Sequence, residues 1–198
     1  TNGSNQKGKK PLLINDLKIL INAIHQSNEK DKRKIRDKAL VLIGFSGGFR
    51  RSELVDIEYE DLEFVSEGVK IFVKRSKTDQ SGEGMTKAIP YFDNKKFCPV
   101  IALKNWIEIF DLKKSRIFNI SDKSVALIIK KYASYAGLDS HRYAGHSLRS
   151  GFATSTAESG AEERNIMAMT GHKSTEMVRR YIKEANLFKN NALNSIKI

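Results

Sequence analysis

The spacing of apolar residues changes along this chain at about residue 62, and that change limits the folds the chain can adopt. On both sides of 62–90, apolar residues recur three or four positions apart, which is typical of helices buried on one face. Within that region, 62–65 and 69–73 predict a β-hairpin with a glycine-containing turn, and 86–90 predicts a third strand. The pattern indicates an α+β fold, mostly helical with one small antiparallel three-stranded sheet.

Capping residues and helical periodicity predict where helices begin and end in the rest of the chain. Asn15 is a suitable N-cap for a first helix, Gly47-Gly48 ends a second, and Ser121 caps a later one. Helical patterns also cover 146–159, 162–169 and about 174–182. We expect a flexible linker or a cloning remnant at 1–14 and one domain at 15–198. Its tail at 187–198 carries a narrow apolar stripe of Phe188, Ala192 and Ile196.

Charge and cysteine content narrow the function classes. With 35 Lys and Arg against 23 Asp and Glu, the formal net charge is +12, which favours a polyanionic partner such as nucleic acid. No apolar run has the length of a membrane span. The single cysteine, Cys98, excludes an intramolecular disulfide and a cysteine metal cluster, so we expect a cytoplasmic, DNA-associated protein.

Five residues together suggest chemistry on a phosphodiester: Arg50, His146, Arg149, His172 and Tyr181. Arginine keeps its proton at neutral pH and offers a planar fork of donors, so a pair can hold a phosphate. A phenol is a weak nucleophile near pH 7 and needs a base or strong electrostatic help. Each residue alone is more simply explained as a surface or core residue, but that explanation does not account for all five in order.

The order and spacing of these residues resemble the tyrosine recombinases, the phage-type integrases that cut and rejoin DNA. The shared marks are an arginine in the turn 47–54, the His146-x-x-Arg149 box, the Gly171-His172 dipeptide, and a tyrosine nine residues after that histidine. The resemblance covers about 11–198 and corresponds to the catalytic domain of the family. Family members usually carry a further N-terminal helical domain, for which there is no room before Asn15.

The resemblance implies a role for each residue. Arg50 and Arg149 bind the non-bridging oxygens of the scissile phosphate, and Tyr181 attacks it to give a 3′-phosphotyrosine and a free 5′-hydroxyl. His146 helps to take the phenolic proton, and His172 hydrogen-bonds the phosphate. The bond energy is conserved in the phosphotyrosine and arginines take the part that metal ions play elsewhere, so no cofactor or metal is expected.

A lysine in the turn between the second and third strands protonates the leaving oxygen in this family. Lys77 lies in that turn, with Lys74 and Lys87 as rival candidates. Four cations near the site are expected to contact the DNA backbone: Arg51, Lys74, Arg75 and Lys87. Glu53 is expected to orient the arginines.

We expect duplex DNA as the partner, a homo-oligomer (a tetrameric synapse) on DNA, and no membrane. The tail either packs on its own domain or docks on a neighbouring protomer. Two alternatives remain open: a type IB topoisomerase-like enzyme that relaxes DNA, and a non-catalytic DNA-binding module with the same fold.

Overall fold

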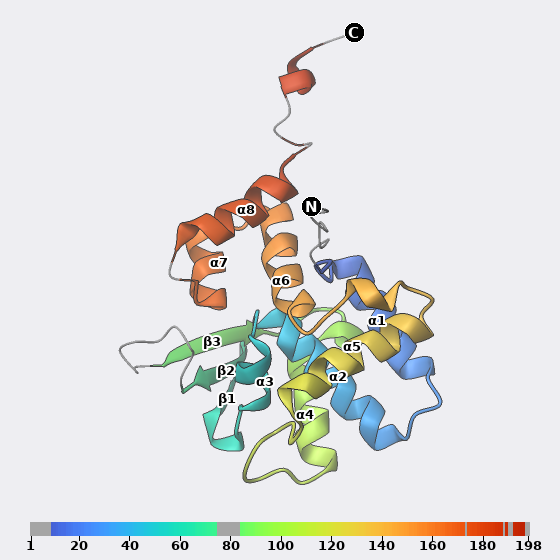
Figure 1. The fold of residues 1–198 in the computed structure, drawn as a ribbon. Helices are drawn as coiled ribbons and strands as arrows, with labels where there is room; N and C mark the ends of the chain where they lie inside the picture. The colour runs from blue at the N-terminus through green and yellow to red at the C-terminus, as the bar shows by residue number, and fades with distance from the viewer. Residues whose placement is uncertain (1–8, 75–83, 173, 188, 190–191, 197–198) are drawn as a thin grey trace, which may run out of the picture.

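The computed structural model describes residues 9–74, 84–172, 174–187, 189 and 192–196, and these form a mostly helical molecule with one three-stranded sheet (Figure 1). The α+β prediction is confirmed. In chain order the elements are α1 (Ile14–Gln26), α2 (Asp31–Ser46), α3 (Arg51–Val55), η1 (Tyr59–Asp61), β1 (Leu62–Val65), β2 (Gly68–Val73), β3 (Met85–Pro90), η2 (Lys95–Phe97), α4 (Pro99–Ile109), α5 (Asp122–Tyr135), η3 (Ser140–Arg142), α6 (Ser147–Glu158), α7 (Glu163–Thr170), α8 (Thr175–Ala185) and η4 (Ala192–Ser195).

The sheet has the order β1-β2-β3, and both pairs are antiparallel. Alternation places Val69, Ile71 and Val73 of β2 on its buried face, while the residues between them face outward. In the register between β2 and β3, Val69 lies opposite Ile89, so apolar side chains meet across the strands on this face. All three strands fall within a residue or so of their predicted bounds.

Most of the apolar core lies within the group of helices α1, α2, α4 and α5, beside the sheet (Figure 1). Helix α2 is at its centre, because every residue from Ala39 to Ser46 is buried. Helix α2 also contacts α6, which carries part of the site described below. Through this contact, the group of helices supports the part of the site that α6 carries.

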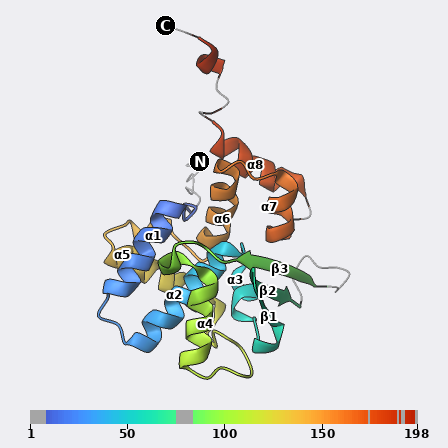
Figure 2. The same cartoon turned by 180° about the vertical axis from the view of Figure 1, so that it is seen from behind.

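Helices α6, α7 and α8 form a smaller packed unit above the sheet (Figures 1 and 2). Its own apolar cluster contains Ala153 and Ala157 of α6, Ile166 of α7, and Val178 and Tyr181 of α8. Tyr181 is therefore held by packing along its ring, with only 9% of the residue exposed.

The segment before α1 differs from its prediction. Residues 1–8 lie outside the described part, but Lys10 and Leu12 are docked: their backbone N–H groups donate to Arg142 O at 2.7 Å and Ser147 O at 2.9 Å. Leu12 is fully buried, and the Lys10 ammonium lies 2.8 Å from Asp16. These contacts rule out a flexible linker here. Helix α1 also begins at Ile14 without a side-chain cap, so the prediction that Asn15 caps this helix is wrong.

The tail leaves α8, and its short helix η4 stands apart from the rest of the molecule in both views (Figures 1 and 2). Leu187 and Ile196 are 56% and 58% exposed. Phe188 of the predicted stripe lies outside the described residues, and Ala192 is exposed. Among the described residues of the tail, nothing is buried against the tail's own domain.

Candidate active site

Arg50 is positioned by the turn that follows α2. Gly48 adopts a left-handed conformation, with φ at 54°, which a side chain would strain. The turn delivers Arg50 to the start of α3, where its backbone N–H donates to Glu53 Oε2 at 2.9 Å and its Nη1 donates to Glu53 Oε1 at 2.5 Å. Glu53 is buried, so it holds the guanidinium in one orientation, as the sequence predicted.

Arg149 reaches the same turn from α6. Only 2% of the residue is exposed, and its Nη1 donates to Gly48 O at 2.8 Å. Burial, followed by the nearby charge of Arg50, lowers the pKa of Arg149 to about 10, which still leaves it protonated at neutral pH. Arg149 thus reaches the turn that precedes Arg50, and the two arginines lie close enough for the charge of Arg50 to lower the pKa of Arg149.

Lys87 is not the DNA-backbone contact that we expected, because it is fully buried. Its Nζ donates to Gly47 O at 2.7 Å and to Met169 O at 2.5 Å, and lies 4.6 Å from the centroid of the Phe49 ring. Burial lowers the pKa of Lys87 to about 7, and the charges of Arg149 and Arg50 act in the same direction. Through these two hydrogen bonds, Lys87 links the turn before Arg50 to the end of α7.

His172 follows α7 through a left-handed glycine, Gly171, whose φ is 65°. Its Nδ1 lies 2.7 Å from Thr170 Oγ1, and its ring centroid lies 6.4 Å from that of Tyr181. Burial first, and then the positive charge of Arg149, lowers the pKa of His172 to about 4. The histidine is thus neutral at pH 7 and lies beside the tyrosine.

Tyr181 projects from α8 toward these groups. Burial raises the pKa of its phenol, and the charge of Arg149 opposes that shift. The phenol is therefore protonated at neutral pH in the protein without DNA, and it needs a proton acceptor when it attacks. The charge of Arg149 acts to lower the pKa values of both His172 and Tyr181, which places these two groups near Arg149.

His146 lies immediately before α6, one turn from Arg149, and its side chain is exposed. Although the residue is exposed, neighbouring protein atoms remove part of its hydration, which lowers its pKa, and the charges of Arg149, Arg51 and Arg50 lower it further. Those three charges show that His146 borders the arginine side of the centre. In contrast to His172, no ring contact joins it to Tyr181 within the described part of the chain.

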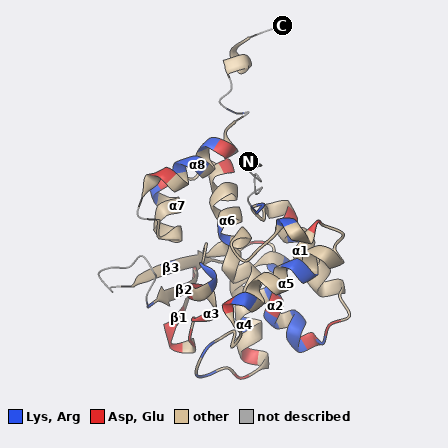
Figure 3. Cartoon of the chain, viewed as in Figure 1, with Lys and Arg blue, Asp and Glu red and all other residues tan. Residues whose placement is uncertain are grey.

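The remaining predicted cations differ in their surroundings. Arg51 is exposed and lies 3.9 Å from Asp122. The Lys74 ammonium is paired with Glu58 and lies 3.2 Å from Asp61, which raises its pKa and makes it a weak candidate for the general acid. Lys77 and Arg75 lie outside the described residues. Elsewhere, Lys and Arg are distributed among acidic residues over several elements, including α2 and α8 (Figure 3).

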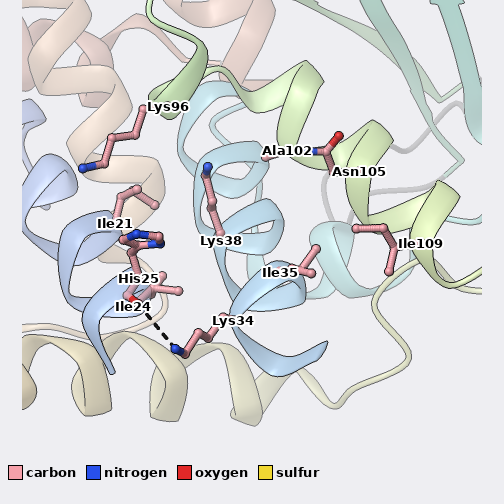
Figure 4. A pocket seen from close by; sticks show the side chains of 10 residues that line it. All are labelled: Ile21, Ile24, His25, Lys34, Ile35, Lys38, Lys96, Ala102, Asn105 and Ile109. Atoms are coloured by element: carbon pink, nitrogen blue, oxygen red, sulfur yellow. Dashed lines mark hydrogen bonds between the residues drawn. The ribbon is translucent and has the colours of Figure 1, made fainter. Parts of the chain in front are cut away.

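A pocket away from these residues is a separate feature. It has a volume of about 380 Å³ and lies among α1, α2 and α4, lined in part by Lys34, Lys38 and Lys96 (Figure 4). Lys34 is linked to His25 O by a hydrogen bond of 3.4 Å. None of the predicted site residues lines this pocket, so it is not the centre described above.

The described ranges contain no group of three or more His, Cys, Asp or Glu residues arranged to hold a metal ion. Across the same ranges, no helix has the length and apolarity needed to cross a membrane. The groups that could bind a phosphate here are Arg50 and Arg149, each already oriented by a protein acceptor.

Two features of the site were missed at the level of sequence. Thr170, two residues before His172, contacts the imidazole, and no sequence pattern indicates that role. The buried position of Lys87 did have a signal, since it lies two residues from Ile89 and strand alternation places both on one face.

Comparison with known sequences identifies relatives over almost the whole chain. Residues 12–187 match the model of the Phage integrase family. An integrase/recombinase xerD homolog of Selenomonas ruminantium is 48% identical, over 97% of this chain and 59% of its own length. The tyrosine recombinase XerC of Syntrophus aciditrophicus is 29% identical, over 86% of this chain and 55% of its own length. The chain thus spans less than two thirds of these relatives.

Solved structures share the fold. XerH site-specific recombinase, bound to palindromic difH substrate in a post-cleavage complex, matches with a TM-score of 0.73 and 19% identity over 96% of this chain and 56% of its own. XerA recombinase matches with a TM-score of 0.72 and 18% identity over 100% of this chain and 68% of its own. At these identities the likeness supports the fold alone.

Proposed function

This chain belongs to the Phage integrase family, and on that premise we propose that it is the catalytic domain of a tyrosine site-specific recombinase that cleaves and rejoins duplex DNA. The observation that carries the proposal is the convergence of Arg50, Arg149, His172 and Tyr181 on one centre, from α3, α6, the end of α7 and α8. A net charge of +12 is consistent with DNA as the partner, and the single buried Cys98 with a cytoplasmic location.

The two arginines bind the non-bridging oxygens of the scissile phosphate. Glu53 and Gly48 O fix their guanidinium groups before DNA arrives, so little reorganisation is needed as negative charge develops. Loss of one such preorganised donor costs about 3 kcal/mol of transition-state stabilisation, or roughly a hundredfold in rate. This arrangement supports arginine rather than surface lysine as the phosphate ligand.

The Tyr181 oxygen attacks the phosphorus, the bond from phosphorus to the 5′ oxygen breaks, and a 3′-phosphotyrosine forms. The phenolic proton goes to one of the two histidines, and the family resemblance favours His146. The 5′ oxygen takes a proton from a general acid, for which the resemblance favours Lys77. Attack of a 5′-hydroxyl on the phosphotyrosine reverses the steps and reseals the strand.

We test this function with duplexes of randomised sequence that carry a nick, so that the strand 3′ to the cleavage site is short and diffuses away. The expected product is a covalent protein–DNA adduct on a denaturing gel, and sequencing the bound strand identifies the target. Tyr181→Phe should form no adduct while binding the selected DNA with unchanged affinity. If the parent protein binds duplex DNA yet forms no adduct with any duplex, the non-catalytic alternative replaces the proposal.

Plasmid relaxation distinguishes the proposed recombinase from the topoisomerase-like alternative. A site-specific recombinase should exchange strands between two copies of the selected sequence. Relaxation of supercoiled plasmids that lack the selected sequence, without strand exchange, would favour the topoisomerase-like reading.

Assembly on DNA is part of the same proposal. Solved structures with this fold include a lambda integrase tetramer bound to a Holliday junction. An apolar groove of about 730 Å³ lies beside α1, α6 and β3, lined in part by Leu17, Ile89 and Phe152. We assign this groove to the tail of a second copy, because the tail carries exposed Leu187 and Ile196 and η4 stands apart from its own domain.

A further inference from the structure

We propose that Thr170 fixes His172 in the tautomer that carries its proton on Nδ1, so that the bare Nε2 accepts the phenolic proton of Tyr181. The inference rests on the proposed function and changes one assignment within it, since the proton acceptor becomes His172 instead of His146. Thr170 acts here as a positioning residue, and His172 as the catalytic group.

The tautomer follows from counting protons around the Thr170 hydroxyl. Thr170 Oγ1 lies 2.7 Å from Ile166 O and 2.7 Å from His172 Nδ1. A carbonyl oxygen can only accept, and a hydroxyl has one proton, so that proton lies between Oγ1 and Ile166 O. The second short contact then requires a proton on Nδ1, which donates to the hydroxyl oxygen.

Burial keeps this arrangement in place. Thr170 is fully buried, and its hydroxyl bonds one turn back along α7, so exchange with water does not compete for either contact. A histidine that is neutral and protonated on Nδ1 has a lone pair on Nε2. His172 is neutral because burial and the charges of Arg149, Arg50, His146 and Lys87 disfavour the imidazolium.

Within the described part of the chain, Tyr181 is the aromatic residue in ring contact with His172. The His172 and Tyr181 rings lie 6.4 Å apart between centroids and are inclined at 44°, and no such contact is recorded for His146 in the described part of the chain. In the cleavage step, the Tyr181 oxygen bonds to phosphorus while its proton moves to Nε2, giving an imidazolium with both nitrogens protonated. The negative charge gathering on the phosphoryl oxygens stabilises that imidazolium. In resealing, Nε2 returns the proton to the departing phenolate.

A phosphate contact by His172 requires the other tautomer, with the proton on Nε2. To donate to a phosphate oxygen, Nε2 must carry a proton, which the Thr170 contact disfavours in the neutral ring. A change that releases the tautomer therefore slows cleavage if His172 accepts from Tyr181, and leaves it unchanged or faster if His172 donates to phosphate.

Thr170→Val and Thr170→Ser provide the test. Valine has the shape of threonine without the hydroxyl, whereas serine keeps both hydrogen bonds. The control is Ser27→Ala at the end of α1, because the buried Ser27 hydroxyl likewise donates back along its helix, to Ile24 O at 2.9 Å, and lies away from both the site and the groove. Thermal unfolding of each variant establishes that it is folded.

The first readout is a long-range ¹H–¹⁵N correlation spectrum, in which protonated and bare ring nitrogens resonate far apart; His172→Asn assigns the signals. We expect a protonated Nδ1 in the parent, in Thr170→Ser and in the control, and a shift toward a protonated Nε2 in Thr170→Val. A protonated Nε2 in the parent overturns the inference, whatever the enzyme does with DNA.

The second readout is the single-turnover rate of adduct formation. We expect Thr170→Val to be about tenfold slower, and the serine and control variants to lie within about twofold of the parent. A valine variant as fast as the parent, or faster, overturns the proton-acceptor role while the parent's adduct still supports the proposed function. Absence of adduct in the parent defeats the proposed function, and with it the proton-acceptor role.

Discussion

The buried Lys87 allows a quantitative prediction of how the free energy of unfolding depends on pH. Lys87 is fully enclosed, and its pKa falls from 10.5 to about 7. Below pH 7 both the folded and the unfolded protein hold the Lys87 proton, and well above pH 10.5 neither does. Between these limits the unfolded chain binds a proton that the folded protein does not.

The sign of the effect follows from that difference. Because the unfolded state binds more protons, the free energy of unfolding rises with pH through this window. One proton contributes a slope of up to about 1.4 kcal/mol per pH unit. Lys87→Met removes the titrating group and fills a similar volume, so the stability of the parent relative to the variant should increase by that slope between about pH 7 and 10.

Urea unfolding measured at half-unit steps from pH 6 to 9.5 tests this expectation. The control is Lys70→Met, because Lys70 lies on the neighbouring strand with its side chain 46% exposed and paired with Glu63. The Lys70→Met curve should run parallel to the parent. A constant difference between the parent and Lys87→Met across pH 7–9.5 would show that Lys87 keeps an ordinary pKa, and the burial argument would fail.

Three further outcomes are expected. Arg149→Lys should slow adduct formation nearly as much as Arg149→Ala, roughly a hundredfold, because lysine lacks the planar fork, whereas Arg51→Lys should stay within about threefold; a lysine variant close to the parent rate would refute the Arg149 assignment. A substrate with a 5′-bridging sulfur, whose thiolate leaves without a proton, should restore cleavage in Lys77→Ala but not in Arg149→Ala; without rescue, the role passes to Lys74, Lys87 or water. Deletion of 187–198 should leave the thermal transition and helical signal intact while abolishing cooperative DNA complexes; an unfolded product would show that the tail packs on its own domain.

The sequence was sufficient for the sheet, and it named candidate site residues of which the fold brings Arg149, His172 and Tyr181 near one another. Alternation in 62–90 gave three strands because one face of β2 is buried, and burial on one face is what that pattern records. The order of the arginine, histidine and tyrosine residues predicted a site through its resemblance to the tyrosine recombinases, and the role of each residue stays a prediction. Neither signal contains a distance, so the approach of Arg149 to the turn before Arg50, through its bond to Gly48 O, had to come from the fold.

Lys87 shows how residue type can mislead where position does not. A lysine beside a basic hairpin is usually a surface cation, and that statistical expectation gave the wrong environment. Position along β3 gave the correct face, because Lys87 and Ile89 are two residues apart. Lys10 was misread similarly: it follows a polar run, yet its ammonium pairs with Asp16 and its backbone docks on Arg142 O.

The same contacts explain how a folded protein can hold several cations around one point. Lys87 and Arg149 donate to the carbonyls of Gly47 and Gly48, so the turn neutralises part of each charge with backbone dipoles. Glu53 is the buried carboxylate that offsets Arg50. Mutual repulsion still remains, because the pKa values of Lys87, Arg149 and His172 are all lowered in part by neighbouring positive charge. A phosphate placed among these groups relieves that repulsion, and the relief increases as the transferring phosphoryl group gains negative charge. The relief already present in the bound substrate strengthens DNA binding, and the additional relief in the transition state lowers the barrier and accelerates the reaction.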